Sequence, residues 1–367
     1  MSDLSPLPSK EPADPFGPVL CDGASDGYRP LDFSGAFEEV REKSVEGTVS
    51  QTGGPGHLPA FAQEASADSN SLVAKLLDVS FGDRAFLLPS ATEAWRVAVE
   101  TIRRYQRLVN RPKRRRLIVC AGASADTGSG LKGDDDVTIL RTDDLGALQA
   151  EINPKTAGIL VAPVRTQNSL EVLAGSWLAG LREIADEYGI VLAFDETFCG
   201  LGRSGMVWAH EWTGVTPDLM ISTRGLAGSV PFAALVATQK VARGGPVSLP
   251  IVDQPALAAG HAVLDALLSL GFLERVQNRA WYLEDRLASM IYTRRDIFKG
   301  MCGIGLMQGL VCTGEAEPLR EKLAERGLLT RAMGPVLGLF PPLTVEEGEI
   351  DAAISTLAMV CAGDESR

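Results

Sequence analysis

The chain has 367 residues, a formal net charge of −12 and 45% hydrophobic residues. This composition is typical of a folded globular protein and excludes collagen-like, coiled-coil and largely disordered chains. An acidic chain repels phosphate backbones, and the apolar runs 157–164 and 190–194 are far shorter than the roughly 18 residues of a membrane span, so we expect neither nucleic acid nor a membrane as a partner.

The hydrophobic pattern predicts alternating strands and helices from residue 84 to residue 222. After a helix at 69–78, we expect a strand at 84–88, a helix at 93–109, strands at 116–120 and 137–140, a helix at 143–151, a strand at 157–161, a helix at 176–188, and strands at 190–194, 219–222 and 232–237. Such alternation is typical of a mostly parallel sheet covered on both faces, whose ligands lie beyond the carboxyl ends of the strands.

The pattern changes near residue 250. Helices are predicted at 254–270 and 273–293, then a strand at 303–311, a helix at 317–326, a strand at 336–340 and a helix at 345–360. This order is typical of a separate α+β unit, and a chain of this length has room for two domains.

One basic cluster interrupts the acidic background, with eight cations between residues 103 and 116. We interpret it as the solvated end of the 93–109 helix and the loop after it, because cations are favourable at helix C-termini. The alternative is a patch that binds polyanions. The cluster consists of Arg103, Arg104, Arg107, Arg111, Lys113, Arg114, Arg115 and Arg116.

The six cysteines are scattered without a C-x-x-C pair, and residues 1–18 are polar and Pro-rich without an apolar signal-peptide core. Both features favour a reducing, cytoplasmic location with inert thiols. The three histidines are isolated from one another, so we expect no metal site.

The first segment suited to a ligand is Ser90-Ala91-Thr92, between the 84–88 strand and the helix after it. Backbone N–H groups at a helix start, together with Ser and Thr hydroxyls, form a cup for an anion such as a phosphorylated metabolite. The alternative is a plain helix N-cap made by Ser90 or Thr92.

Two further segments follow buried strands. Asp195 and Glu196 come directly after the 190–194 strand, where a carboxylate can bind a cationic ligand or a metal; the alternative is a turn carboxylate. Arg224 lies in a Gly-rich loop after the 219–222 strand, where a guanidinium can hold a phosphate or carboxylate through two hydrogen bonds. The alternative for Arg224 is an ordinary surface arginine.

Together these segments resemble the class III, acetylornithine-type pyridoxal-phosphate aminotransferases. The likeness is carried by AFDETFCGLGRSGMVWAHEWTGVTPDLMISTRGLAGSVPFAALVAT (193–238), GIGLMQGL (303–310), AERGLLTR (324–331) and LFPPLTVEEGEIDAAI (339–354), and it extends over residues 69–360. The resemblance implies an aspartate-aminotransferase-like, fold type I architecture. We expect a large α/β domain over 50–255 with a mostly parallel seven-stranded sheet, and a small α+β domain made of 1–49 and 256–367.

The resemblance also implies roles for individual residues. Asp195 matches the aspartate that pairs with the pyridine nitrogen of the cofactor, and Ser90, Ala91 and Thr92 match the cup for its phosphate. Family members form dimers, so a homodimer, or a heterodimer with an active relative, is expected.

The departures from the family concentrate in the predicted site. Arg224 stands where the family has its Schiff-base lysine, and a guanidinium, which stays protonated at physiological pH, supplies no neutral amine. The next lysine, Lys240, follows a further strand. The other departures are Ser124 and Ala125 for the ring-stacking aromatic and the histidine after it, Ala162–Gln167 for E-P-x-x-G-E, Phe198 for a glutamine, Pro250 for a threonine, and Gly338 for the arginine that binds a substrate carboxylate.

Two hypotheses follow. The first is a catalytically silent homologue that acts as a scaffold, a regulatory subunit or a metabolite-binding protein, and binds pyridoxal phosphate non-covalently at most. The second is an active transaminase of an acetylornithine-like amine with 2-oxoglutarate.

Overall fold

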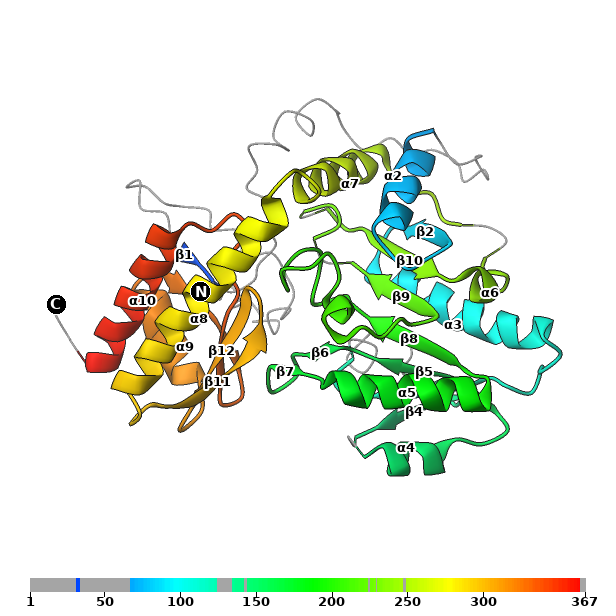
Figure 1. Cartoon of the computed structure of the whole chain (residues 1–367), viewed down its shortest axis with the longest axis horizontal. Coiled ribbons are helices and arrows are strands. Elements are labelled where there is room, and N and C mark those ends of the chain that lie inside the picture. The colour runs from blue at the N-terminus through cyan, green and yellow to red at the C-terminus, as the bar shows by residue number, and fades with distance from the viewer. Residues whose placement is uncertain are drawn as a thin grey trace, which may run out of the picture.

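The computed structural model describes residues 31–33, 67–123, 134–141, 144–223, 225–228, 230–246 and 249–363. Two groups of elements are visible in Figure 1, one built on a seven-stranded sheet and one on a four-stranded sheet. No single described helix is long and apolar enough to span a membrane, although two consecutive helices that meet at a bend of 71° pass that test of length and composition together.

The large sheet has the order β2-β10-β9-β8-β5-β3-β4. Its strands are β2 (Arg84–Leu88), β3 (Arg116–Cys120), β4 (Val137–Leu140), β5 (Thr156–Val161), β8 (Val191–Asp195), β9 (Leu219–Ser222) and β10 (Ala233–Ala237). Strand β10 runs antiparallel to both β9 and β2, while the remaining neighbours pair in parallel. The predicted seven-stranded, mostly parallel sheet is confirmed.

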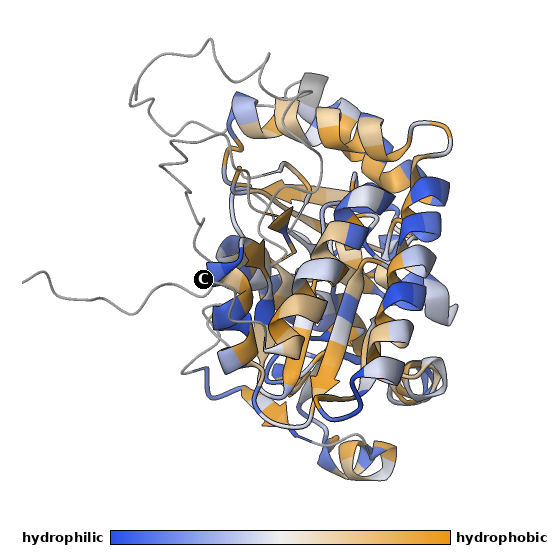
Figure 2. Ribbon diagram, turned by 90° about the vertical axis from the view of Figure 1, so that its left-hand side faces the viewer, coloured by the Kyte–Doolittle hydropathy of each residue, from blue (hydrophilic) through white to orange (hydrophobic). Residues whose placement is uncertain are grey.

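Helices cover both faces of this sheet, because successive strand residues point to opposite sides. On one face Leu117, Val119 and Ala193 pack against α3 (Ala91–Leu108) and α6 (Gln239–Ala242). On the other face Ile118, Leu192 and their neighbours pack against α2 (Ala67–Asp78), α4 (Leu145–Glu151), α5 (Gly175–Tyr188) and α7 (Gln254–Leu267). In Figure 2 the strands are predominantly hydrophobic and the surrounding helices carry hydrophilic turns.

The four-stranded sheet has the order β11-β12-β15-β14, and all its neighbours are antiparallel. Its strands are β11 (Phe298–Ile304), β12 (Met307–Cys312), β14 (Arg331–Met333) and β15 (Val336–Leu339), and the helices of this part are α8 (Phe272–Thr293), α9 (Glu317–Glu325) and α10 (Glu347–Ala362). Two short pairs complete the fold, β1 (Leu31–Asp32) with β13 (Leu328–Leu329), and β6 (Val164–Arg165) with β7 (Glu171–Val172). A 3₁₀ helix, η3, spans Ala209–Thr213.

One predicted strand is divided in two, and several short elements were not predicted. The single strand expected at 303–311 is a hairpin, in which β11 and β12 meet at Gly305 and Leu306. The sequence does not reveal this turn, because Leu306 in it is apolar rather than polar. Its side chain is fully buried, and its N–H donates to the Arg203 carbonyl at 2.9 Å. The short strand β14 was not predicted either.

Within the basic cluster, the described contacts are structural. Arg103 pairs with Asp134 at 2.8 Å, Arg116 pairs with Glu151 at 2.8 Å, and Arg114 donates to the Gly189 carbonyl at 2.8 Å. Gly189 is the left-handed residue that ends α5, so Arg114 satisfies a carbonyl at a helix C-terminus. These contacts agree with the interpretation of the cluster as a helix end and loop.

The predicted domain boundary near residue 255 stays a prediction. Helix α7 lies against α2 beside the large sheet, and its Gly260 approaches the Leu72 side chain. Helix α8 packs on the four-stranded sheet. Strand β1 pairs with β13, which brings residues 31–32 beside the C-terminal part of the chain.

Candidate ligand site at the strand ends

The strand ends that carry the predicted residues share one edge of the large sheet. Asp195 of β8 pairs with Ile221 of β9, Ser222 pairs with Ala234 of β10, and Ala233 pairs with Leu88 of β2. Because β10 is antiparallel to both neighbours, β2 runs in the same direction as β8 and β9. The segments after β2, β8 and β9 therefore leave the same edge, with about 14 Å between the β2 and β8 ends at roughly 4.8 Å per strand.

Asp195 is held in place by the turn that follows it. Its side chain is only 2% exposed, and its Oδ1 accepts hydrogen bonds from the Thr197 N–H at 3.0 Å and the Thr197 hydroxyl at 2.5 Å. The Thr223 hydroxyl, just after β9, donates to the Thr197 carbonyl at 3.3 Å. The structure therefore shows the turn-carboxylate role considered for Asp195, in a position that faces the strand-end edge.

Glu196 has a different role from its neighbour. It is fully buried, and its two carboxylate oxygens accept from the Ala209 and His210 N–H groups at 2.8 Å each. The same carboxylate lies 2.8 Å from the Nδ1 of His210, whose ring packs edge-on against Phe81 and Phe194. Of the predicted acidic pair, Glu196 thus fixes the start of η3. No local pattern pointed to His210, because its partner lies 14 positions away along the chain.

Ser90 is the N-cap of α3. Its Oγ accepts from the Glu93 N–H at 3.2 Å, and its backbone is extended, as an N-cap requires. Ala91 and Thr92 lie exposed on the first turn. A serine hydroxyl that accepts one hydrogen bond keeps its own proton to donate, so the capping role leaves Ser90 able to bind an anion. The negative end of a ligand would also meet the positive N-terminus of an 18-residue helix.

The loop after β9 makes a tight turn in which Gly225 and Gly228 form an isolated bridge, both with positive φ. Leu226 and Ala227 between them are buried. Arg224 lies outside the described residues, as do Ser124 and Ala125, so their predicted positions in the site stay predictions.

The described lysines lie away from this edge. Lys240 follows β10, and five residues of antiparallel strand, about 17 Å, carry it to the opposite edge of the sheet, where its ammonium lies 5.8 Å from the Tyr105 ring centre. Lys113 and Lys155 precede β3 and β5 at that same opposite edge.

The other described lysines lie on helices or on the small sheet. Lys75 forms an ion pair with Asp265 of α7, and Lys299 and Lys322 belong to β11 and α9. Lys10, Lys43 and Lys132 are outside the described residues.

Two aromatic rings and a guanidinium meet beside the end of β8, and of these three residues only Phe198 was noted from the sequence. Phe198, three residues after Asp195, packs edge-on against Phe340 with 5.7 Å between ring centres. The Arg331 guanidinium of β14 lies 5.3 Å from the Phe198 ring centre. Phe340 belongs to a buried cluster with Val164 and Cys199, and Phe198 packs against that cluster. Only the tertiary structure brings them together.

Burial also raises the pKa of Cys199, the thiol that follows Asp195 and Glu196 in the chain. Cys199 is fully buried, and desolvation, reinforced by the negative charges of Glu196 and Asp195, raises its pKa well above the ordinary value. A neutral thiol is a poor nucleophile. Within the described residues, no group of three His, Cys, Asp or Glu side chains could hold a metal ion.

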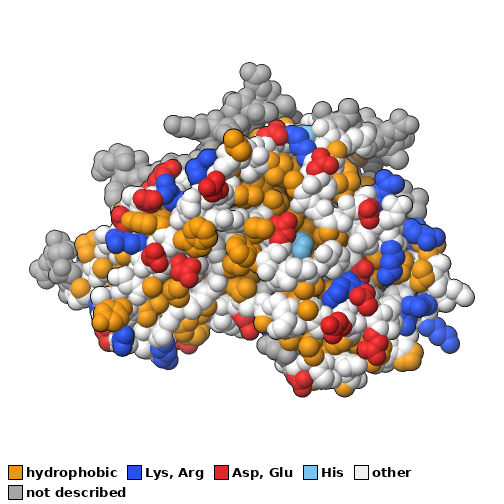
Figure 3. Space-filling model, in the orientation of Figure 1, with side chains coloured by type: hydrophobic (Ala, Val, Ile, Leu, Met, Phe, Trp, Pro, Cys, Tyr) orange, Lys and Arg blue, Asp and Glu red, His pale blue; other side chains and the backbone are white. Residues whose placement is uncertain are grey.

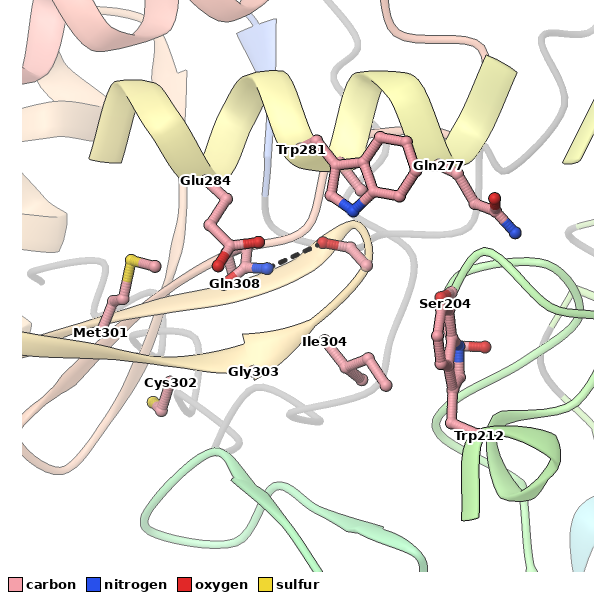
Figure 4. A pocket seen from close by; sticks show the side chains of 12 residues that line it. Ser204, Trp212, Gln277, Trp281, Glu284, Met301, Cys302, Gly303, Ile304 and Gln308 are labelled. Carbon is pink, nitrogen blue, oxygen red and sulfur yellow. Dashed lines mark hydrogen bonds between the residues drawn. The ribbon is translucent and has the colours of Figure 1, made fainter. Parts of the chain in front are cut away.

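A separate pocket of about 310 Å³ lies between α8, the β11–β12 hairpin and the loop after β8 (Figure 4). Trp281 and Glu284 of α8 point into it, and Trp212 faces them with its Nε1 donating to the Ser204 carbonyl at 2.9 Å. Both tryptophans are about half exposed. Figure 3 shows hydrophobic side chains gathered over the middle of the face that Figure 1 presents. The described lining of this pocket includes none of the site residues predicted from the sequence.

Comparison with known proteins agrees with this arrangement. The family model described as Aminotransferase class-III matches residues 124–361. The chain belongs to the class III aminotransferase family. It is 34% identical to an acetylornithine aminotransferase of Mesorhizobium japonicum over 77% of this chain and 76% of that protein, and 33% identical to acetylornithine aminotransferase 1 of Bradyrhizobium diazoefficiens over 94% and 90%.

Solved structures show the same fold. The N-acetylornithine aminotransferase of Stenotrophomonas maltophilia superposes with a TM-score of 0.72 at 27% identity, covering 83% of this chain and 82% of that one. The acetylornithine aminotransferase of Elizabethkingia anophelis gives a TM-score of 0.77, and at 19% identity it supports the fold alone. The predicted family and fold type I architecture are therefore confirmed.

Because the family depends on pyridoxal phosphate, the strand-end residues can be tested against that cofactor. The α3 N-terminus and the Ser90 hydroxyl fit its phosphate, and the buried Asp195 carboxylate fits a protonated pyridine nitrogen. The described residues thus fit the phosphate and the ring nitrogen of the cofactor.

Proposed function

We propose that this class III aminotransferase homologue is catalytically silent and acts as a metabolite-binding or regulatory protein, with pyridoxal phosphate bound non-covalently at most. The observation that carries the proposal is the missing amine. By the resemblance in sequence, Arg224 stands at the position of the family lysine. The next lysine, Lys240, follows the antiparallel strand β10, at the opposite end of the strands from Asp195. A guanidinium stays protonated at physiological pH, so it cannot attack an aldehyde.

The chain's own residues retain the capacity to bind. Ser90 and the first turn of α3 would hold an anionic group, and Asp195, at the end of a strand three positions further along the same sheet, would hold a cationic ring nitrogen. Pyridoxal phosphate, when bound, supplies an aldehyde and an electron-withdrawing ring. A phosphorylated metabolite of similar length would make the same two contacts without that chemistry.

Borohydride trapping tests the proposal. The purified chain is saturated with pyridoxal phosphate, treated with sodium borohydride, dialysed and weighed by intact-protein mass spectrometry. We expect no added cofactor mass, since reduction fixes the cofactor only where a lysine has condensed with it. The matched control is Arg224→Lys, in which trapped cofactor would show that the pocket still accepts the aldehyde. Stoichiometric trapping at one lysine of the unmodified chain would contradict the proposal.

The second candidate is an active transaminase of an acetylornithine-like donor with 2-oxoglutarate. Its support is the retained Asp195 and Ser90, together with 34% identity to a protein named acetylornithine aminotransferase. It requires a lysine from elsewhere in the chain or from a partner. Turnover of acetylornithine by the purified chain alone would favour it over the silent homologue.

We further propose that the chain forms a homodimer, or a heterodimer with an active relative. The support is membership of the family, in which the sites lie at the subunit interface.

A further inference from the structure

The pocket between α8 and the β11–β12 hairpin is built from both parts of the chain (Figure 4). Gln277, Trp281 and Glu284 follow one another on α8 at spacings of four and three residues, so they share one face of the helix. Trp212 of η3 stands across from that face. The volume of about 310 Å³ lies within the range of small-molecule pockets, roughly 300–1,000 Å³.

Hydrogen bonds to the backbone fix two of the side chains that line this pocket. The Trp212 Nε1 donates to the Ser204 carbonyl at 2.9 Å, which holds the plane of the indole ring. On the hairpin, the Gln308 Nε2 donates to the Gly305 carbonyl at 3.0 Å (Figure 4). Side chains held in this way lose little conformational freedom when a ligand binds, so the pocket is preorganised.

Gln308 presents a hydrogen-bond acceptor to the pocket. Its side chain is only 4% exposed. Its amide nitrogen is bonded to the Gly305 carbonyl, and its Oε1 accepts no hydrogen bond from the part of the chain that the structure describes. Because buried amide groups are normally hydrogen-bonded, this oxygen favours a ligand that donates an N–H.

The described lining of the pocket carries one charge, the carboxylate of Glu284. This carboxylate points into the pocket (Figure 4), and it forms no ion pair with a described lysine or arginine. The indole rings of Trp212 and Trp281 have electron-rich faces, which attract cations. Charge and aromatic faces therefore both favour a positively charged ligand.

We propose that this pocket binds a small organic cation with a primary ammonium group on an apolar body. The ammonium would pair with the Glu284 carboxylate and donate to the Gln308 amide oxygen. The apolar body would lie against the indole rings of Trp212 and Trp281. The described lining includes no residue of the strand-end site, so this second site does not depend on the proposed function.

Calorimetric titration with two probes tests for a cation site. Benzylammonium and benzyl alcohol share the same aromatic body and differ in charge. We expect benzylammonium to bind with a Kd on the order of 1 mM and benzyl alcohol to bind at least about 10-fold more weakly. Equal binding of the two probes would overturn the proposal, as would the absence of benzylammonium binding at ten times the expected Kd.

Substitution of the charged residue locates the bound probe. Glu284→Gln should weaken benzylammonium binding by about 10- to 100-fold, the effect of losing a charge-assisted hydrogen bond. The matched control is Asp285→Asn, which removes the same charge at the neighbouring exposed position of α8, outside the described lining. An unchanged affinity in Glu284→Gln would place the probe at another site, such as that of Asp195, and would overturn the proposal. An equal loss in both variants would show a general charge effect and overturn it too.

A second pair of variants tests the aromatic wall. Trp281→Leu should weaken benzylammonium binding by about 3- to 30-fold, because it removes one electron-rich face from the pocket. Tyr292→Leu is the control, since Tyr292 is another exposed aromatic residue of α8 and does not belong to the described lining. Both side chains are exposed, so neither substitution should disturb the fold. Equal affinities in the two variants would contradict the role of the indole ring.

Discussion

At position 224, a single substitution should not restore transamination. Arg224→Lys would return a nucleophile and general base, the latter typically worth about 10²- to 10⁴-fold in rate. The departures from the family at Ser124, Phe198 and Gly338 would remain. Reacting groups misplaced by about 1 Å can lose about 10²-fold in rate. We therefore expect no turnover of acetylornithine with 2-oxoglutarate near 1 s⁻¹, the lower end of typical enzyme rates. A rate of that order in a stopped assay would show that Arg224 alone silences the chain.

Glu196 should matter for stability rather than for ligand binding. Glu196→Ala would leave the Ala209 and His210 N–H groups buried without their acceptor, at about 1–3 kcal/mol each. We expect the free energy of unfolding to fall by about 3–5 kcal/mol in urea titration. Glu187→Ala, an exposed carboxylate on α5, is the control and should change it by less than about 0.5 kcal/mol. An equal loss of unfolding free energy in the two variants would refute the structural role of Glu196.

Cys361 gives the fold an alkaline sensitivity. Burial raises the pKa of its thiol to about 11. The native thiol therefore holds its proton at pH values where the unfolded thiol has lost it, so this stability is present below pH 9 and is lost as pH rises toward 11. Between pH 9 and pH 11 the unmodified chain should lose about 2 kcal/mol more of its free energy of unfolding than Cys361→Ala does. Urea titrations at both pH values measure this loss, and an equal loss in the unmodified chain and in Cys361→Ala would contradict the prediction.

Among the elements, the β11–β12 hairpin depends on a glycine at its turn. Gly305 has φ of +59°, and a Cβ there would lie 2.4 Å from the Arg203 carbonyl oxygen and 2.6 Å from the Ser204 carbonyl carbon. Both are backbone atoms, so the clash cannot be relieved by a rotamer change. Gly305→Ala should destabilise the chain by about 2–4 kcal/mol, the sum of a left-handed alanine and a backbone shift.

The same hairpin provides the control for that substitution. Gly300 of β11 has no positive φ, and nothing lies within 4 Å of a Cβ added there. Gly300→Ala should therefore be neutral or slightly stabilising, because it reduces the freedom of the unfolded chain. Thermal unfolding of both variants measures the difference, and similar melting temperatures would show that the turn does not dock on the 203–204 backbone.

The direction of β10 decides more about the site than any single residue of that strand. The sequence 232–237 predicts a strand and is silent on its direction. Since β10 runs antiparallel to β9, it returns the chain to the edge opposite Asp195 and removes Lys240 from the site. A parallel β10 would have required a crossover of a dozen or more residues, which the short 223–232 connection does not provide.

For the whole molecule, we expect a dimer in solution. Light scattering at micromolar concentration should give about twice the 39.0 kDa of one chain. Interfaces of obligate dimers commonly bury 2,000 Å² or more, so such a dimer should persist on dilution to nanomolar concentration. A mass near that of one chain would contradict the homodimer, and the heterodimer would then be tested by mixing with an active relative.

The family, the alternation of strands and helices, and the strands that end in polar side chains could all be predicted from the residues alone. These are local properties, because periodicity and turn residues act over a few positions; β2, β3, β4 and β9 have the predicted bounds for this reason. The hairpin at Gly305 was missed because its turn is stabilised by the Arg203 backbone, a contact about a hundred residues away in sequence.

The partner of each polar group, by contrast, depends on how the chain packs in three dimensions. Asp195 and Glu196 are adjacent in sequence, yet one faces the strand-end edge and the other is bound to His210 and the start of η3. The register of β14 against β15 set Arg331 opposite Gly338, and the packing of the two sheets brought it over Phe198. Register and sheet packing depend on contacts summed over the whole chain, so a pattern read over a few residues does not contain them.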